Sequence, residues 1–289
     1  MEDAERYFTT RHAKPARDKS EKDPVSIDYP DLTQHGVEQA RERARQEISN
    51  LIDRSSGHSV IFIGATSDQP RTKQTAEIYG DELSSLGVDR NDLVVVTRRQ
   101  IESIVGNSRG ISEAVRSVQE LLNSNSDKKV VIDFPLMVKQ LAYKFDDRWT
   151  DSSGNKTPYF SEVLKKHNND HAQAGLDWIA NDGKLELNDG RVLQGPRPEK
   201  VAREYLEGLR RLRKFVNRYV GGRPVVIGEV GHQWDIDALV TYLATNGHVD
   251  KQSFDRVTGG QIAGETEFTE FTIDGTGTHI RYRGKEFDV

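Results

Sequence analysis

Short apolar runs that alternate with amphipathic segments are the feature that most constrains the fold of this sequence. Such runs, when four to eight residues long and rich in β-branched residues, are typical of strands. They cover residues 6–10 (rather polar), 59–64, 93–96, 129–132 and 224–230. The alternation predicts an α/β fold: a three-layer sandwich with a mostly parallel central sheet, helices on both of its faces, and an insertion.

Helical periodicity fills most of the intervals between these strands. Val37, Ala40, Ala44, Ile48 and Leu51 share one face of a helix, and Thr33 is placed to cap its N-terminus. Further helices are expected over residues 72–86, 112–122, 198–219 and 236–243, and a β-hairpin over 267–273 and 279–282.

Residues 134–197 depart from this alternation. Turn-forming clusters such as Asp151-Ser152-Ser153-Gly154 and Asn181-Asp182-Gly183 separate short helical stretches there. We predict one domain over residues 1–289, with 134–197 as an insertion that is either a cap over the site or a contact in a homodimer. Aromatic residues in this insertion are candidates for either use: Tyr143, Phe145, Trp149, Tyr159, Phe160 and Trp178.

Composition excludes several classes of function. The 289 residues carry a net charge of −5, which is not the charge of a polycation that follows nucleic acid. The absence of cysteine excludes thiolate nucleophiles, disulfides and cysteine-ligated metals. No apolar run is long enough for a membrane span, and residues 1–6 are acidic where a signal peptide is basic. We therefore expect a cytoplasmic protein with neither nucleic acid nor membrane as partner.

Polar residues stand where the predicted strands end. Arg11 and His12 close the first strand, Arg71 follows the second, and His232 follows the strand at 224–230. Ligands of open α/β sheets bind at the carboxyl ends of the strands, so these side chains are expected to converge. Two arginines and two histidines at one point favour an anionic ligand, above all a phosphate group.

In their order along the chain, these motifs resemble those of the histidine phosphatase superfamily, which has the phosphoglycerate-mutase-like fold. The motifs are Arg11-His12, the helix start Leu32-Thr33-Gln34-His35-Gly36, the segment Arg71-Thr72-Lys73-Gln74-Thr75-Ala76-Glu77, and Gly231-His232. The resemblance spans most of the chain and leaves out residues 134–197.

The resemblance implies a phosphohistidine mechanism. His12 would accept the phosphoryl group, and Arg11, Arg71 and His232 would bind its oxygens. The proton for the leaving oxygen would come from a carboxyl group: Glu102 is the better match to the family's position, and Asp133 is the competitor. No cofactor is implied, and the expected partner is a small phosphorylated metabolite.

Departures from the family pattern favour a phosphatase over a mutase. Ala13 stands where glycine is usual, and the mutase continuation with Glu-Ser and Trp-Asn after that position is absent. The alternatives are a phosphoglycerate-mutase-type phosphotransferase and a non-catalytic protein that binds a phosphorylated ligand. Gln233 and Trp234 follow His232 in place of small residues, which predicts a narrower pocket.

Other charged and histidine-containing stretches have simpler interpretations. His167 and His171 have the spacing of a zinc pair, but the glutamate of His-Glu-x-x-His is missing, so no metal site is predicted. Cations at positions 14, 17, 19 and 22 alternate with acids at 18, 21 and 23, as in a solvated loop. The basic residues within 210–214 are expected on the solvent-exposed face of an amphipathic helix.

Overall fold

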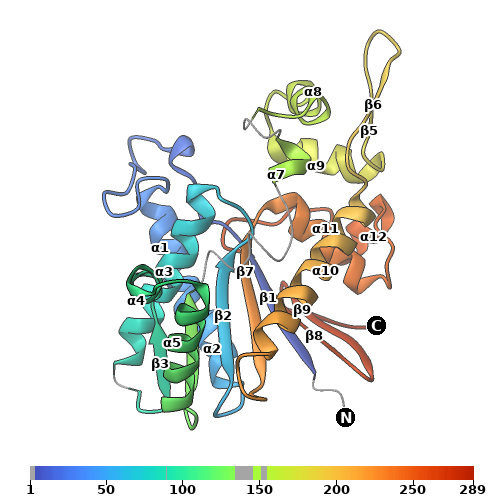
Figure 1. Ribbon diagram of the computed structural model, residues 1–289. Helices are drawn as coiled ribbons and strands as arrows, with labels where there is room; N and C mark the ends of the chain where they lie inside the picture. Colours follow the sequence, from blue (N-terminus) through green and yellow to red (C-terminus); the bar gives the residue numbers. More distant parts are fainter. Residues whose placement is uncertain (1–3, 89, 134–145, 151–154) are drawn as a thin grey trace.

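The central element is an eight-stranded sheet with the order β10-β9-β8-β1-β7-β2-β4-β3 (Figure 1). The computed structural model describes residues 4–88, 90–133, 146–150 and 155–289. The strands are β1 (Glu5–Arg11), β2 (Val60–Ala65), β3 (Leu93–Val96), β4 (Lys129–Asp133), β7 (Val225–Gly231), β8 (Phe268–Asp274), β9 (Gly277–Tyr282) and β10 (Lys285–Asp288).

The sheet is parallel over most of its width. Strands β1, β7, β2, β4 and β3 pair in parallel, and β8, β9 and β10 continue the sheet antiparallel beyond β1. All the predicted strands are present, and the predicted hairpin is extended by β10, which the sequence analysis missed. Because the parallel strands run in one direction, the residues that follow β1, β2 and β7 reach the same edge.

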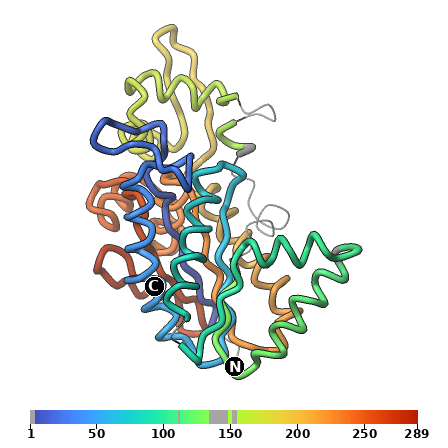
Figure 2. The backbone as a smooth tube through the Cα atoms, turned by 90° about the vertical axis from the view of Figure 1, so that its left-hand side faces the viewer, coloured from blue at the N-terminus to red at the C-terminus, as the bar shows by residue number. Residues whose placement is uncertain are grey.

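Helices cover both faces of the sheet, which confirms the predicted architecture (Figure 2). In β2, Ile61 and Ile63 contact one helical layer, whereas Val60 and Phe62 face the other. The first layer holds α1 (Gln34–Arg43), the wide turn η2 (Ala44–Ile48), α2 (Ser49–Asp53) and α3 (Pro70–Gly87). The second layer holds α4 (Arg98–Asn107), α5 (Ile111–Ser124), α10 (Pro198–Asn217), α11 (Gln233–Ala244) and α12 (Lys251–Thr258).

Five described elements lie between β4 and α10. They are α7 (Asp146–Trp149), α8 (Pro158–Lys166), α9 (His171–Ala180), β5 (Lys184–Glu186) and β6 (Val192–Gln194). Figure 1 shows them beyond the edge of the sheet at which β1 ends. A short 3-10 turn, η1 (Ala16–Asp18), lies in the loop after β1.

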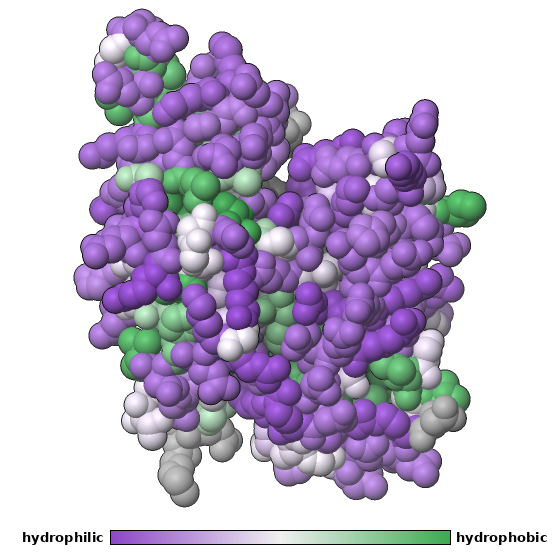
Figure 3. All heavy atoms as spheres, turned by 180° about the vertical axis from the view of Figure 1, so that it is seen from behind, coloured by the Kyte–Doolittle hydropathy of each residue, from purple (hydrophilic) through white to green (hydrophobic). Residues whose placement is uncertain are grey.

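Much of the outer surface is hydrophilic. On the face opposite to that of Figure 1, apolar residues form only small separate groups (Figure 3). Within the described part of the chain, none of the helices has the length and apolar content needed to cross a membrane.

Candidate active site

A cavity of about 250 Å³ lies at the edge where the parallel strands end. Arg11, His12, Arg71 and His232 all line it, so the structure brings together the four side chains that the sequence predicted to converge. The rings of His12 and His232 lie edge to face, with their centroids 5.3 Å apart.

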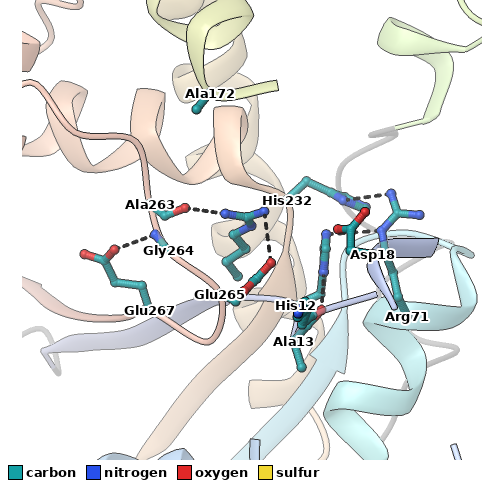
Figure 4. A network of polar contacts seen from close by, with 12 residues as sticks. His12, Ala13, Asp18, Arg71, Ala172, His232, Ala263, Gly264, Glu265 and Glu267 are labelled. Atoms are coloured by element: carbon teal, nitrogen blue, oxygen red, sulfur yellow. Dashed lines mark hydrogen bonds and ion pairs between the residues drawn. The ribbon is translucent and has the colours of Figure 1, made fainter. Parts of the chain in front are cut away.

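One nitrogen of the His12 imidazole is hydrogen-bonded to the backbone, and the other faces the guanidinium of Arg71. Nδ1 lies 2.8 Å from the carbonyl oxygen of Ala13. A carbonyl can only accept a hydrogen bond, so Nδ1 carries the proton. The lone pair is therefore on Nε2, which accepts a hydrogen bond from Nε of Arg71 over 3.1 Å (Figure 4).

The guanidinium of Arg71 lies between the two imidazoles. Besides its bond to His12, its Nη2 lies 3.4 Å from Nδ1 of His232, and its Nη1 donates to Oε1 of Gln69 over 3.2 Å. Arg71 is at the start of α3, immediately after Pro70. Its delocalised charge and fixed fork of donors suit the oxygens of a phosphoryl group.

Ser67 orients His232. Its hydroxyl lies 2.8 Å from Nε2 of the imidazole. Because Arg71 can only donate, Nδ1 of His232 is the acceptor and Nε2 carries the proton. No signal in the sequence predicted this contact.

Burial and neighbouring cations keep both histidines neutral. His12 is 4% and His232 6% exposed. Burial, and then the charges of Arg71 and Arg11, holds the pKa of His12 well below its usual value of 6.5. Burial also lowers the pKa of His232, and His12 and Arg71 lower it further. His12 is therefore an unprotonated nitrogen base at neutral pH.

Arg11 reaches the cavity from the end of β1, held by residues of the loop before β8. Its Nη1 donates to the carbonyl of Ala263 over 2.7 Å, and Nη2 lies 3.9 Å from Oε1 of Glu265. Burial lowers the pKa of this guanidinium, an effect opposed by the charge of Glu265. Arg11 thus contributes a cation with a fixed position beside His12.

The remaining motif residues hold the loop after β1 against the helices. A Cβ on Gly36 would stand 2.7 Å from the carbonyl oxygen of Lys14, so only glycine lets α1 approach the loop this closely. Thr33 caps α1, as predicted, by accepting from the backbone N–H of Gly36. Thr75 accepts from the backbone N–H of Ala13 over 3.0 Å, which fixes the backbone next to His12.

The structure does not bring Glu102, the proton donor preferred from the sequence, to this cavity. Glu102 is exposed on α4 and is not among the residues that line the cavity. The sequence stretch that matched the family pattern forms a helix whose buried residues are Arg98 and Ile101, so Glu102 turns to solvent.

Asp133 does not line the cavity either. It is 1% exposed at the end of β4, where Oδ1 lies 3.5 Å from Nη2 of Arg98 and its side chain packs against Gly80 of α3. Burial raises the pKa of Asp133 to about 6, against the opposing charge of Arg98. The carboxyl that does line the cavity, among the described residues, belongs to Asp235 in the first turn of α11.

Residues from the insertion and from the loop after β1 complete the cavity wall. Arg17, which the sequence suggested to be part of a solvated loop, lines it, and so do Trp149, Lys156, Phe160 and His171 from the insertion. Of the aromatic residues named from the sequence, Trp149 and Phe160 therefore reach the site, whereas Tyr143 and Phe145 lie outside the described residues.

Trp234 joins the insertion to the rest of the domain. Its ring is stacked on Trp178, with centroids 5.6 Å apart, and meets Trp149 edge to face at 5.0 Å. Its Nε1 donates to the backbone carbonyl of His171 over 2.9 Å. The large residue that replaces a small one after His232 thus lines the cavity and anchors the insertion.

The described residues contain no group of three or more histidine, aspartate or glutamate side chains arranged to hold a metal ion. His167 and His171 diverge: His167 pairs with Asp177 at 3.0 Å, and His171 faces the cavity.

The whole described fold is similar to solved structures of phosphatases and a mutase. No protein-family model matches the chain, and no curated protein does. Among the solved structures, "Mycobacterial hydrolase 1" is 16% identical, with a TM-score of 0.42 over 99% of this chain and 98% of that one. A mycobacterial glucosyl-3-phosphoglycerate phosphatase is 14% identical (TM-score 0.43, 96% of each chain). The phosphoglycerate mutase of Bacillus anthracis is 13% identical (TM-score 0.39, 98% and 94%).

Proposed function

We propose that this chain is a phosphomonoester hydrolase that works through a phosphohistidine intermediate on His12. The observation that carries the proposal is the tautomer of His12: Nδ1 is committed to the carbonyl of Ala13, and Nε2 presents its lone pair to the cavity beside Arg71. A buried neutral imidazole with a fixed orientation is a prepared nucleophile.

The neighbouring cations suit the transition state of phosphoryl transfer. Arg11 and Arg71 line the cavity together with His12, and Nε of Arg71 lies 3.1 Å from His12 Nε2. As a phosphoryl group approaches, Arg71 can exchange its bond to His12 for bonds to phosphoryl oxygens and so free the nitrogen for attack. Donors already in position for a developing negative charge lower the barrier, each by about 3 kcal/mol.

Asp235 is the proposed proton donor. In the first step the P–N bond to His12 forms, the bond from phosphorus to the leaving oxygen breaks, and Asp235 gives its proton to that oxygen. In the second step water attacks phosphorus, the P–N bond breaks, and the water proton returns to the carboxylate. Asp235 is 1% exposed and shares the cavity wall with His12, which supports this assignment over Glu102.

The insertion is proposed to act as a cap. Its described residues Trp149, Phe160 and His171 form the wall opposite the strand ends. Aromatic side chains at this place limit the access of bulk water to the cavity and offer an apolar surface to the part of the substrate beyond its phosphate. This is the first of the two uses that the sequence left open.

The test is detection of the intermediate. Wild type, His12→Ala and the matched control His35→Ala, which changes an exposed histidine on α1, are mixed with a labelled aryl phosphate and quenched. We expect an acid-labile, alkali-stable phosphoprotein and release of phosphate from wild type and His35→Ala, and neither from His12→Ala. Turnover by His12→Ala at the wild-type rate would refute the proposal.

Two further outcomes identify the alternatives. Transfer of the label between two hydroxyl groups of one substrate, without release of phosphate, would indicate a mutase. Tight binding of phosphate without any phosphoprotein would indicate a non-catalytic binding protein.

A further inference from the structure

We propose that Arg17 and Lys156 form a second anion-binding subsite in the cavity, so that the preferred substrate is a phosphomonoester carrying another acidic group, a carboxylate or a second phosphate. The inference rests on the proposed function, because it assumes that the reacting phosphate lies at His12. Three features of the cavity support it. The cavity holds more cations than one phosphate needs, the backbone at Arg17 and Lys156 is held by hydrogen bonds, and His171 lines the same wall.

The cavity has more positive charge than one phosphate requires. Arg11, Arg17, Arg71 and Lys156 line it, whereas Asp235 is the one carboxyl group among its described lining residues. A phosphate monoester brings at most two negative charges, which the two arginines beside His12 offset. The charges of Arg17 and Lys156 are left for another part of the ligand.

Among the residues that the structure describes, neither of these two cations has a strong internal ion pair. Nε of Arg17 lies 3.7 Å from the carboxylate of its neighbour Asp18, and both side chains are about half exposed, so this contact is weak. Lys156 makes no ion pair with any residue that the structure describes. By contrast, Lys14 in the same loop is bonded to Asp23 over 2.7 Å.

The backbone that carries each cation is tied to its surroundings. Next to Arg17, the N–H of Ala16 donates to the carbonyl of Asp31 over 2.8 Å. The side chain of Gln74 in turn accepts from the backbone N–H of Asp31 and donates to the Asp31 carboxylate. Lys156 pairs with Thr150 in an isolated β-bridge. Two segments that are far apart in sequence are thus fixed on the cavity wall.

His171 lines the same cavity as both cations. Burial, and then the charges of Arg17 and Lys156, lowers the pKa of His171 to about 4. At neutral pH this imidazole is therefore uncharged and adds hydrogen-bonding capacity without a charge. A neutral, polar group in a cavity that also holds two such cations is suited to a carboxylate or phosphate.

The experiment compares phosphomonoesters that carry a second acidic group with analogues in which that group is uncharged. Wild type, Arg17→Gln, Lys156→Gln and the double variant are assayed on ω-carboxyalkyl phosphates of increasing chain length and on the methyl esters of the same compounds. A parallel series of alkanediol bisphosphates distinguishes a second phosphate from a carboxylate. Lys22→Gln, an exposed cation of the same loop that does not line the cavity, is the matched control.

For the best chain length we expect wild type to prefer the acid over its ester by at least about tenfold in kcat/KM, mainly through KM. Each single variant should lose most of this preference, and the double variant should lose all of it. In the Arg17 and Lys156 variants the kcat/KM for the ester should fall less than that for the acid, and Lys22→Gln should match wild type on both. Equal use of acid and ester by wild type, or a preference that survives in the double variant, would overturn the inference.

Binding measurements separate this inference from the proposed function. In a His12→Ala background, calorimetric titration with the acids and the esters measures the same preference without turnover. If the proposed function is wrong, the neutral esters are not hydrolysed by wild type, whatever the binding shows. If only the subsite is wrong, the esters are hydrolysed and the binding preference is absent.

Discussion

The indole Nε1 of Trp234 donates to the backbone carbonyl of His171 over 2.9 Å, and so links the helix that follows the second active-site histidine to the insertion. The indole can occupy this place because residue 175 has no side chain: a Cβ on Gly175 would stand 2.5 Å from Nε1. The geometry of the cavity wall thus depends on one glycine of α9.

Gly175→Ala is expected to displace Trp234 and to lower the free energy of unfolding by about 1–3 kcal/mol, the usual cost of overpacking. It should also raise KM, because Trp149 and Phe160 rest on the same ring. Urea denaturation and steady-state kinetics measure both effects. Gly106→Ala is the matched helical control, since a Cβ there meets nothing within 4 Å. An equal effect of the two substitutions would contradict this account.

Arg71→Gln is expected to reduce kcat/KM by about 10²–10³, because a donor to the phosphoryl oxygens is lost. It should also change the pH profile. The charge of Arg71 helps to keep the pKa of His12 low, so its removal raises that pKa and moves the acidic limb of the kcat/KM profile to higher pH. Arg71→Lys keeps the charge and should leave the limb in place. An unmoved limb in Arg71→Gln would show that Arg71 does not act on His12.

Asp235→Asn is expected to slow the hydrolysis of alkyl phosphates by about 10²–10⁴, since their leaving oxygens need a proton. Formation of the phosphohistidine from 4-nitrophenyl phosphate should change little, because that leaving group departs as an anion. Formation of the phosphohistidine from both substrates is followed by rapid quench. Glu102→Gln, an exposed carboxyl on α4, should behave as wild type. An equal loss in the rate of phosphohistidine formation from both substrates would instead indicate a structural role for Asp235.

Glu229→Gln is expected to change how stability depends on pH. Glu229 is fully buried on β7, and burial raises its pKa to about 8, with Tyr205 opposing. The folded protein therefore keeps this proton up to about pH 8, whereas the unfolded chain releases it near 4.5. Between these values the folded state binds the extra proton, so this group makes stability fall as pH rises, by about 1.4 kcal/mol per pH unit.

In Glu229→Gln this contribution disappears. The free energy of unfolding relative to wild type should therefore rise steadily from pH 5 to pH 8 and level off above it. Urea titrations across that range measure the difference. The constant cost of burying an amide shifts the whole curve and leaves its slope unchanged. A difference that does not vary with pH would mean that Glu229 is ionised in the folded protein.

The sequence was sufficient to place the parts of the site that lie on the sheet. Arg11, His12 and His232 follow apolar runs, and parallel strands bring their ends to one edge whatever the loops do. The helix cap at Thr33 was also readable, since it depends on the next three residues alone.

The proton donor and the two further cations of the cavity, Arg17 and Lys156, could not be predicted in this way. The family pattern placed the acid after β3, but the helical periodicity of α4 buries Ile101 and turns Glu102 outward. Arg17 and Lys156 reach the cavity only because a long loop and the insertion close over it. Which charges of such segments point inward depends on tertiary contacts, and alternating charge along the chain does not report them.

If His12 is the nucleophile, as proposed, the hydrogen bond from Arg71 to His12 affects the release of the product. The imidazole nitrogen regenerated by hydrolysis is an acceptor that competes with inorganic phosphate for the same guanidinium. Arg71 can therefore return to His12 as the product leaves, which offsets part of the free energy of phosphate dissociation. Under the proposed mechanism, His12 would thus limit product inhibition at its own site.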